Sequence, residues 1–272
     1  MSATFTSPWP FARGLRPLIG MVHLGPLPGA PLYDGDLQGV IDRARADAEA
    51  LAAGGVHAVM VENFHDAPFF KSGLPPETVA ALTRAAVEVK AVIGDLPLGI
   101  NALRNDGRSA LAIAVASQAA FIRVNVLVGA MVTDQGIIEG CAAELLRAAK
   151  LLDARHIGVW ADVAVKHAAP LGALDLSQQA KDAVHRARAA ALVVSGSGTG
   201  QPTDPSRIAA VQAAVPGTPV VIGSGATPAT AATLGAADAF IVGTALKGPD
   251  GLVASDRVAA MRAAVDALPP RA

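Results

Sequence analysis

The sequence has little of what marks several common classes of protein. Its 272 residues include a single cysteine, Cys141, so an intrachain disulfide is excluded and a reducing compartment is expected. With 22 Lys and Arg against 23 Asp and Glu, the formal net charge of −1 gives no general attraction to nucleic acid or anionic lipid. Only 4% of the residues are aromatic while 52% are hydrophobic, so a core must be built from aliphatic side chains and alanine.

An apolar run long enough to cross a bilayer is also missing, although the mean hydropathy of +0.42 is high. The apolar stretch 110–122 contains Ser117 and Gln118 and is followed by Arg123, well short of a membrane span. Residues 1–16 lack the apolar segment and the small-residue cleavage site of a secretory signal. These observations predict a cytoplasmic protein with no transmembrane segment and no nucleic-acid partner.

Strand-like runs of apolar residues alternate with helical segments along the whole chain. Strands are expected at 18–24, 58–63, 98–102, 121–126, 157–163, 191–195, 220–223 and 239–243, and helices at 37–53, 76–93, 108–117, 141–152, 177–188, 205–214, 228–234 and 256–268. Strict alternation is typical of an all-parallel α/β fold. Eight units in a chain of this length favour a single (β/α)8 TIM barrel over 17–268, with an N-terminal arm at 1–16 and a C-terminal tail at 269–272.

The joints between these segments differ in length at the two ends of the predicted barrel. Helix-to-strand joints are short, whereas the strand-to-helix joints 25–36, 64–75, 127–140 and 166–176 are long. Long loops in compact domains are commonly functional, and the strand-to-helix loops of a barrel form its active face. We therefore expect the functional site at the carboxyl ends of the strands.

Two glycine clusters close consecutive strands near the C-terminus, at 195–200 and at 223–225. Each is either a tight loop or a turn that lets backbone N–H groups approach an anion. Two such turns on neighbouring strands match the phosphate site of many (β/α)8 barrels. The predicted phosphate-binding residues are Gly198, Thr199, Gly200, Gly223, Ser224, Gly225, Gly243 and Thr244.

Polar side chains also gather at the predicted strand ends, where an apolar strand would otherwise exclude them. The candidate catalytic residues are His23, Glu62, Asn101, Arg123, Asp162, Lys166 and His167. Glu62 interrupts an apolar strand, so we expect it to act as a general acid, a general base or a metal ligand. Arg123 and Asp162 either take part in chemistry or form a structural ion pair. Lys166 either forms a Schiff base or holds an anion electrostatically, and we favour the second role.

A divalent metal is a secondary hypothesis. His23, Glu62, Asp162 and His167 have side chains that ligate metals, but they come from separate segments without a diagnostic spacing. No residue is therefore assigned as a metal ligand, and no cofactor is predicted with certainty.

Short motifs are spread over nearly the whole chain beyond the N-terminal arm. They are GMVHL at 20–24, LPG at 27–29, EN at 62–63, GIN at 99–101, LRND at 103–106, FIRVN at 121–125, DQG at 134–136, ADV at 161–163, VKH at 165–167, TG at 199–200, GSG at 223–225 and GTALK at 243–247. Taken together, these motifs resemble the BtpA/SgcQ family. The resemblance implies a TIM barrel related to the phosphate-binding barrels. It also implies a link with photosystem I accumulation in cyanobacteria, where a member behaves as a peripheral thylakoid protein, whereas SgcQ-type members look like enzymes of sugar metabolism.

The sequence as a whole favours an enzyme that acts on a small phosphorylated metabolite, either a sugar phosphate or a nucleoside-derived phosphate. Glu62 and Asp162 would transfer protons, and Lys166 or Arg123 would stabilise negative charge. Isomerase, lyase and hydrolase chemistry all stay open. The alternatives are a non-catalytic assembly factor of the photosystem I type and a phosphometabolite sensor. A homo-oligomer is possible, since barrels often associate, but no helix shows a decisive interface stripe.

Overall fold

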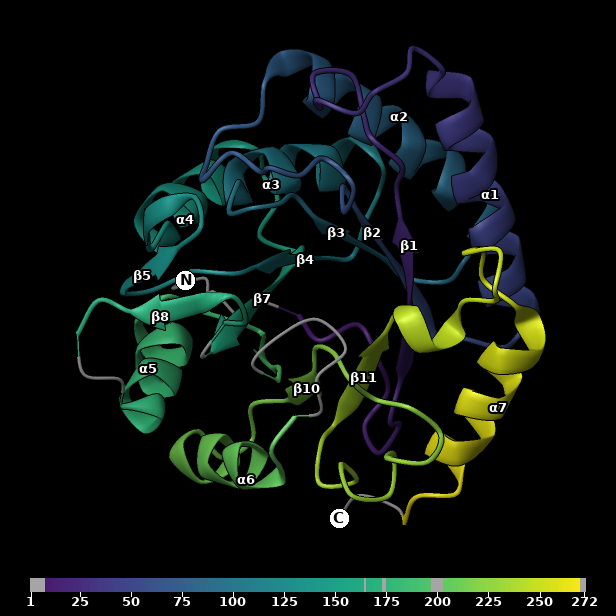
Figure 1. The fold of residues 1–272 in the computed structure, drawn as a ribbon. Coiled ribbons are helices and arrows are strands. Elements are labelled where there is room, and N and C mark those ends of the chain that lie inside the picture. The colour runs from purple at the N-terminus through teal and green to yellow at the C-terminus, as the bar shows by residue number, and fades with distance from the viewer. Residues whose placement is uncertain (1–7, 164, 173–174, 197–202, 270–272) are drawn as a thin grey trace.

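The computed structural model describes residues 8–163, 165–172, 175–196 and 203–269. Eight parallel strands form a closed barrel in the order β1-β11-β10-β9-β7-β4-β3-β2, with helices around it (Figure 1). The strands are β1 (Leu18–His23), β2 (Ala58–Glu62), β3 (Leu98–Asn101), β4 (Phe121–Val124), β7 (Gly158–Val163), β9 (Ala191–Val194), β10 (Val220–Ile222) and β11 (Ala239–Val242). Each lies within a predicted strand, so the predicted (β/α)8 fold is confirmed.

The helices begin where the sequence offers an N-terminal cap. Asp36, Asp106 and Asp204 each accept a hydrogen bond from a backbone N–H in the first turn that follows. Proline opens two of the helices, at a position where no N–H is needed. The helices are α1 (Leu37–Ala53), α2 (Pro76–Ile93), α3 (Gly107–Ala116), α4 (Ala142–Leu151), α5 (Leu176–Lys181), which continues as a π-helix at Asp182–Arg186, α6 (Pro205–Ala214) and α7 (Ser255–Asp266).

The helix predicted at 228–234 is wrong, because this segment forms a series of turns. Its first hydrogen bonds go to threonine hydroxyls: the Thr227 N–H donates to Thr230 Oγ1 at 2.9 Å, and the Thr230 N–H donates to Thr227 Oγ1 at 3.2 Å. Threonine side chains that bond nearby backbone in this way compete with the helical pattern.

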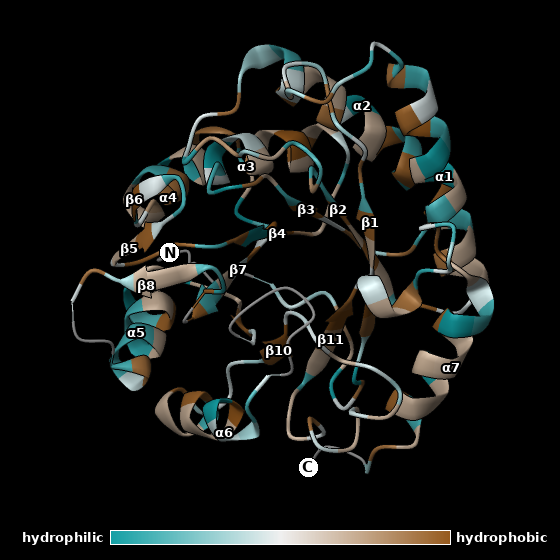
Figure 2. Ribbon diagram, viewed as in Figure 1, coloured by the Kyte–Doolittle hydropathy of each residue, from teal (hydrophilic) through white to brown (hydrophobic). Residues whose placement is uncertain are grey.

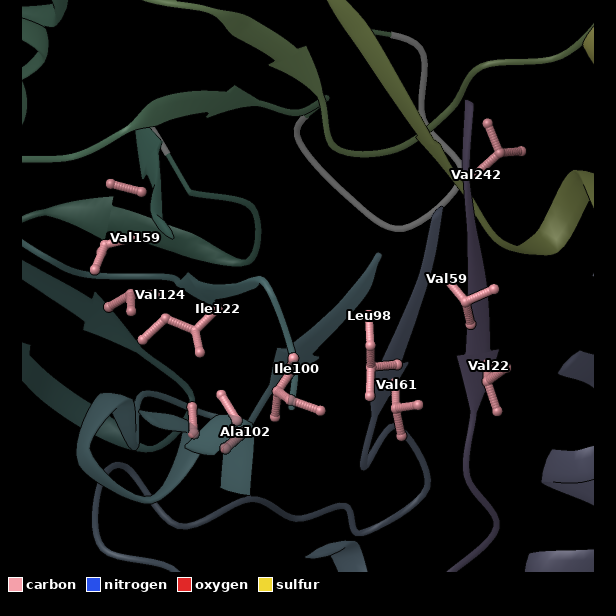
Figure 3. Close-up of a cluster of buried hydrophobic side chains, with 14 of the residues drawn as sticks. Val22, Val59, Val61, Leu98, Ile100, Ala102, Ile122, Val124, Val159 and Val242 are labelled. Carbon is pink, nitrogen blue, oxygen red and sulfur yellow. The ribbon is translucent and has the colours of Figure 1, made fainter. Parts of the chain in front are cut away.

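The alternation of side chains along each strand divides the core into two layers. One set points outward against the helices, and Figure 3 shows part of it, including Val22 on β1, Val59 and Val61 on β2, and Leu98 on β3. In Figure 2 the strands β10 and β11 are mainly brown, which marks hydrophobic residues, while the helices carry both brown and teal. The other set fills the barrel itself and consists of Ile19, Met21, Ala58, Met60, Phe121, Trp160, Ala191, Val193, Val221, Ala239 and Ile241.

The N-terminal arm packs against the inner layer. Trp9 stacks on Trp160 with ring centroids 5.1 Å apart, and Phe11 lies edge-on to Trp9 at the same distance. On its other side Trp160 stacks on Phe121 at 3.9 Å. These four rings include both tryptophans of the chain.

The long loops contain a small sheet that the sequence did not predict. Strands β5 (Ala130–Thr133), β6 (Gly136–Glu139) and β8 (Ala168–Pro170) pair antiparallel in the order β6-β5-β8. This sheet ties the loop after β4 to the loop after β7, beside the carboxyl ends of the barrel strands (Figure 1). Within the described parts of the chain, no helix combines the length and the apolar character that crossing a membrane requires.

Candidate active site

The inward-pointing positions continue beyond the apolar layer to the carboxyl end of every barrel strand. We call the inward residue at this end of each strand, or directly after it for β9, β10 and β11, the strand-end ring. It consists of His23, Glu62, Asn101, Arg123, Asp162, Ser195, Gly223 and Gly243. The strand register places His23 beside Glu62, Glu62 beside Asn101, and Asn101 beside Arg123. Six members are polar and two are glycines, so the barrel changes from apolar to polar within one layer.

Glu62 lies at the centre of the polar half of the ring. One carboxylate oxygen, Oε2, accepts a short hydrogen bond from the Asn101 amide, and the other, Oε1, is 3.9 Å from His23 Nε2. The imidazole of His23 stacks on Phe64 with centroids 4.3 Å apart. Burial lowers the pKa of His23 to about 4 even though Glu62 acts in the opposite direction. His23 is therefore neutral near pH 7, and the Glu62 carboxylate has no cationic partner at this contact.

Arg123 and Asp162 form the ion pair that was one of the two interpretations of these residues. Arg123 Nε donates to Asp162 Oδ1 at 2.8 Å and Nη2 donates to Oδ2 at 2.9 Å, while Asn125 Nδ2 donates to Oδ2 at 3.0 Å. The two charged side chains are 3% and 1% exposed. Although burial opposes its charge, the pKa of Arg123 is raised by Asp162. Because both oxygens of Asp162 are occupied, these contacts favour a positioning role over proton transfer.

Lys166 follows β7 and lines the space above the ring. Its pKa is lowered, first by burial and then by the neighbouring charge of Arg123. Within the described part of the chain, no hydrogen bond or ion pair engages its ammonium group. A partly buried cation without such a partner is suited to holding an anion or stabilising negative charge.

A cavity of about 200 Å³ lies over the two glycines of the ring. Its walls are formed by Met21, His23, Glu62, Phe64, Arg123, Lys166, the turn 223–227 and the segment 242–245. Gly225 has a φ of +77°, and the buried Ser224 hydroxyl has no hydrogen-bond partner among the described residues. The predicted residues Gly223, Ser224, Gly225, Gly243 and Thr244 are thus brought together with Glu62 and Lys166 in this first cavity.

The two ring glycines are required by close packing rather than by backbone conformation. A Cβ on Gly223 would overlap Ser195 Oγ and lie 2.5 Å from Val193 Cγ1. A Cβ on Gly243 would lie 2.7 Å from His23 Cε1. Distances this short do not occur between real side chains, so larger residues here would displace the strand ends.

A second cavity of about 350 Å³ shares Glu62, Phe64, Arg123 and Lys166 with the first. It is completed by Leu32, His65, Ala67, Phe69, Asn101, Leu103, Arg104, Asn125 and His167. The pKa of His167 is lowered by burial and by Lys166, so His167 is held toward its neutral form. The predicted catalytic residues other than Asp162 line one or both cavities, and Asp162 contacts Arg123 beneath them.

The described part of the site includes neither three of the predicted phosphate-binding residues nor the hypothetical metal site. Gly198, Thr199 and Gly200 lie outside the described residues. Among the residues that are described, no three His, Cys, Asp or Glu side chains are placed to hold a metal ion together. The hypothetical metal site of His23, Glu62, Asp162 and His167 is therefore not assembled.

Several residues that line the two cavities were absent from the predicted site, and Phe64, Arg104 and Asn125 are among them. Phe64 lines both cavities, and Arg104 and Asn125 line the second. Phe64 follows Glu62 and Asn63 in a chain with only 7 phenylalanines, which was a usable signal. Arg104 and Asn125 lie at predicted strand ends, yet nothing in the sequence distinguishes them from residues that only fasten loops.

The sequence of the chain was compared with those of known protein families. A sequence model of the BtpA family matches residues 15–266. The chain belongs to the BtpA family. It is 47% identical over 233 residues to the photosystem I biogenesis protein BtpA of Synechocystis, a match that covers 85% of this chain and 80% of the relative. It is 49% identical over 242 residues to an uncharacterized protein of Thermococcus kodakarensis, covering 89% and 90% of the two chains.

The barrel of this BtpA-family chain also resembles those of solved enzyme structures. The chain matches KGPDC from Streptococcus mutans with a TM-score of 0.60 at 11% identity, covering 93% of this chain and 99% of that one. It matches a 3-hexulose-6-phosphate synthase with a TM-score of 0.59 at 18% identity, covering 92% and 99%. At these identities the likeness shows the fold alone, which is the TIM barrel.

Proposed function

We propose that the protein is an enzyme that acts on a small phosphorylated metabolite, such as a sugar phosphate or a nucleoside-derived phosphate. One observation carries the proposal: the glycine turns after β10 and β11 share a cavity with Glu62 and with the cations Arg123 and Lys166. A glycine turn presents backbone N–H groups that suit a phosphate, and a buried carboxylate nearby suits proton transfer. The names of several structural relatives include a phosphorylated compound, which agrees with this assignment.

In this proposal the phosphate lies against Gly223, Ser224 and Gly225, and its site is completed by Gly243 and Thr244. The Ser224 hydroxyl, which is buried without a partner among the described residues, gains one from a phosphate oxygen. Lys166 adds charge to the same cavity. This places the phosphate at one side of the barrel mouth, so the rest of the molecule extends over the polar half of the strand-end ring.

Glu62 is the group we propose for proton transfer. The Asn101 amide orients its carboxylate, and neutral His23 beside it is able to accept or donate a hydrogen bond as the proton moves. Lys166 and Arg123 stabilise the negative charge that develops on the substrate, and Asp162 holds Arg123 in place. Isomerases, lyases and hydrolases all use this combination, so the proposal fixes the roles and not the reaction class.

Phosphate binding is tested with a charge placed in the glycine turn. Aspartate tolerates a positive φ better than most side chains, so Gly225→Asp should fold while its carboxylate repels phosphate. The matched control is Gly217→Asp, because Gly217 has a φ of +82° and open space around it but lies at the opposite ends of the strands. Isothermal titration with inorganic phosphate, ribose-5-phosphate and glucose-6-phosphate should show binding by the wild type and by the control only.

Absence of binding to a broad panel of phosphorylated sugars and nucleotides by the folded wild type would overturn this proposal. Turnover assays on the compounds that do bind then separate an enzyme from a sensor. Glu62→Gln keeps the hydrogen bond from Asn101 but cannot accept a proton, so it should abolish turnover while leaving binding within a few-fold. Binding without turnover by the wild type would favour the sensor.

A further inference from the structure

The second cavity contains a buried cation that the proposed chemistry does not use. Arg104 follows β3, is 5% exposed and lines this cavity. Its guanidinium has five N–H donors, but the described residues accept only one hydrogen bond from it, from Nη2 to the Lys166 carbonyl oxygen at 2.6 Å. Nε is buried with no partner, and no carboxylate among the described residues lies within ion-pair distance.

Such an arrangement is costly for the protein alone. A buried charge normally has a partner, because removal from water is otherwise uncompensated. Burial accordingly lowers the pKa of Arg104, and the carboxylates of Asp162, Asp134 and Glu62 offset this only from a distance. The guanidinium is therefore prepared for an anion that the protein itself does not supply.

The position of Arg104 is fixed by the loops around it. Its own N–H donates to the Phe70 carbonyl oxygen at 3.1 Å. On one side, Asn63 Oδ1 accepts from the Leu103 N–H at 2.7 Å, and on the other Asn105 Oδ1 accepts from the Val126 N–H at 2.8 Å. A side chain held in this way loses little freedom when a ligand binds, which favours specific recognition.

The other polar groups of the cavity define the ligand more closely. Asn125 donates to Asp162, which leaves its buried Oδ1 as an acceptor without a partner among the described residues. Lys166 adds a second cation, whereas the charge of Asp162 is neutralised by Arg123. The cavity thus offers donors and positive charge at Arg104 and Lys166, and a free acceptor at Asn125.

We propose that the second cavity binds a carboxylate group of the substrate through Arg104, with Asn125 accepting a hydrogen bond from a neighbouring hydroxyl. The inference rests on the proposed function, since it places this carboxylate on the same molecule whose phosphate occupies the first cavity. The planar fork of an arginine matches a carboxylate in shape and charge. A monoanion also suits a cavity that contains Glu62 better than a second phosphate dianion does. The substrate class is then a phosphorylated hydroxy acid.

Matched pairs of ligands test this directly. Glucose-6-phosphate and 6-phosphogluconate differ by a carboxylate at the far end from the phosphate, as do glycerol-3-phosphate and 3-phosphoglycerate. In isothermal titration the wild type should bind the acid of at least one pair roughly tenfold more tightly or better, because charged hydrogen bonds are formed only there. This comparison needs no variant, so it holds even where a substitution prevents folding.

Variants then assign the preference to Arg104. Arg104→Gln should remove the preference while leaving affinity for the sugar phosphate without a carboxylate unchanged, and Arg104→Lys should retain part of the preference. Arg84→Gln, on the exposed face of α2 and outside both cavities, is the matched control and should keep the full preference. Retention of the full preference by folded Arg104→Gln would overturn the assignment.

The remaining outcomes separate this inference from the proposed function. Equal binding of the acid and its counterpart without a carboxylate in both pairs would overturn the inference and leave the phosphate site intact. A preference for fructose-1,6-bisphosphate over fructose-6-phosphate, with none for the acids, would also overturn it, because the second group is then a phosphate. Binding of gluconate or glycerate, but of no phosphorylated compound, would support the carboxylate site and overturn the proposed function.

Discussion

At the scale of single residues, burial determines the protonation state of groups in the strand-end ring. His23 illustrates how burial selects one protonation state, since its pKa falls to about 4 despite the neighbouring Glu62 carboxylate. We expect an NMR titration of the His23 ring to have its midpoint near pH 4, with no change near pH 6.5. Glu62→Gln should move this midpoint lower still, because it removes the one neighbour in the site that raises the pKa of His23. A wild-type midpoint above pH 6 would show that the imidazolium pairs with Glu62 and would contradict the neutral role.

The same shift has a consequence for stability. In the unfolded chain His23 takes up a proton near pH 6.5, whereas in the folded protein it does so only near pH 4. The unfolded state binds more protons between these values, so His23 makes the free energy of unfolding fall as the pH is lowered through this window. The full effect is on the order of 3 kcal/mol. In urea unfolding at several pH values, His23→Gln should lose correspondingly less stability than the wild type.

The sequence predicted most of the ring because a polar residue that ends an apolar strand is conspicuous. Glu62, Asn101, Arg123 and Asp162 were all found in this way. It did not decide whether Arg123 and Asp162 react or pair, because that depends on a contact between side chains on different strands. Arg104 was not selected, because its burial and its lack of a partner arise from loops distant in the sequence.

At the scale of secondary structure, alternation and capping residues determined the barrel strands and most of the helices. The π-helical end of α5 and the turns at 227–235 depend on hydrogen bonds that periodicity does not reveal. The small sheet of β5, β6 and β8 was also missed, because β8 pairs with β5 across a long intervening stretch of chain. Apolar runs and capping residues predict the elements that build the core, and they fail for the partly exposed strands of the small sheet and for turns set by particular hydrogen bonds.

Gly223, in the turn after β10, is packed closely against the end of β9. Gly223→Ala adds a methyl group that overlaps Ser195 Oγ and crowds Val193, so β9 and β10 must move apart. We expect a loss of roughly 1–3 kcal/mol in urea unfolding, together with weaker phosphate binding. Gly172→Ala is the control, because Gly172 has no atoms within 4 Å of a built Cβ and no positive φ, and it should stay near the wild-type stability.

A second substitution separates crowding from other effects of the alanine. Ser195→Gly removes the overlapping oxygen, so the double variant Gly223→Ala/Ser195→Gly should recover part of the lost stability relative to the sum of the single changes. The recovery should be incomplete, because Val193 Cγ1 still lies 2.5 Å from the added Cβ. If the changes in the free energy of unfolding are strictly additive, the alanine at position 223 and the Ser195 hydroxyl do not clash.

At the scale of the whole molecule, the barrel separates a polar mouth from a closed, aromatic base. Two strands contribute to both ends. On β4 the inward-pointing Phe121 is followed by the inward-pointing Arg123, and on β7 Trp160 is followed in the same way by Asp162. The mouth contains buried charges that oppose folding, and the base contains the large rings that favour it. If the proposed function is right, stability and ligand recognition depend on opposite ends of the same strands, as is typical of barrels.

The N-terminal arm tests this separation, because Trp9 and Phe11 pack on Trp160 and have no place in either cavity. Trp9→Ala/Phe11→Ala leaves one face of Trp160 open to water, and since both rings are half-buried we expect a loss of roughly 2–4 kcal/mol in urea unfolding. The emission of Trp160 should shift to longer wavelength at the same time. The dissociation constant for a phosphorylated ligand should remain within about twofold of the wild-type value, because the mouth keeps its packing. A large loss of affinity in the folded variant would mean that the base and the mouth are coupled through β4 and β7. An unchanged free energy of unfolding would mean that the contacts of the arm with Trp160 do not stabilise the barrel.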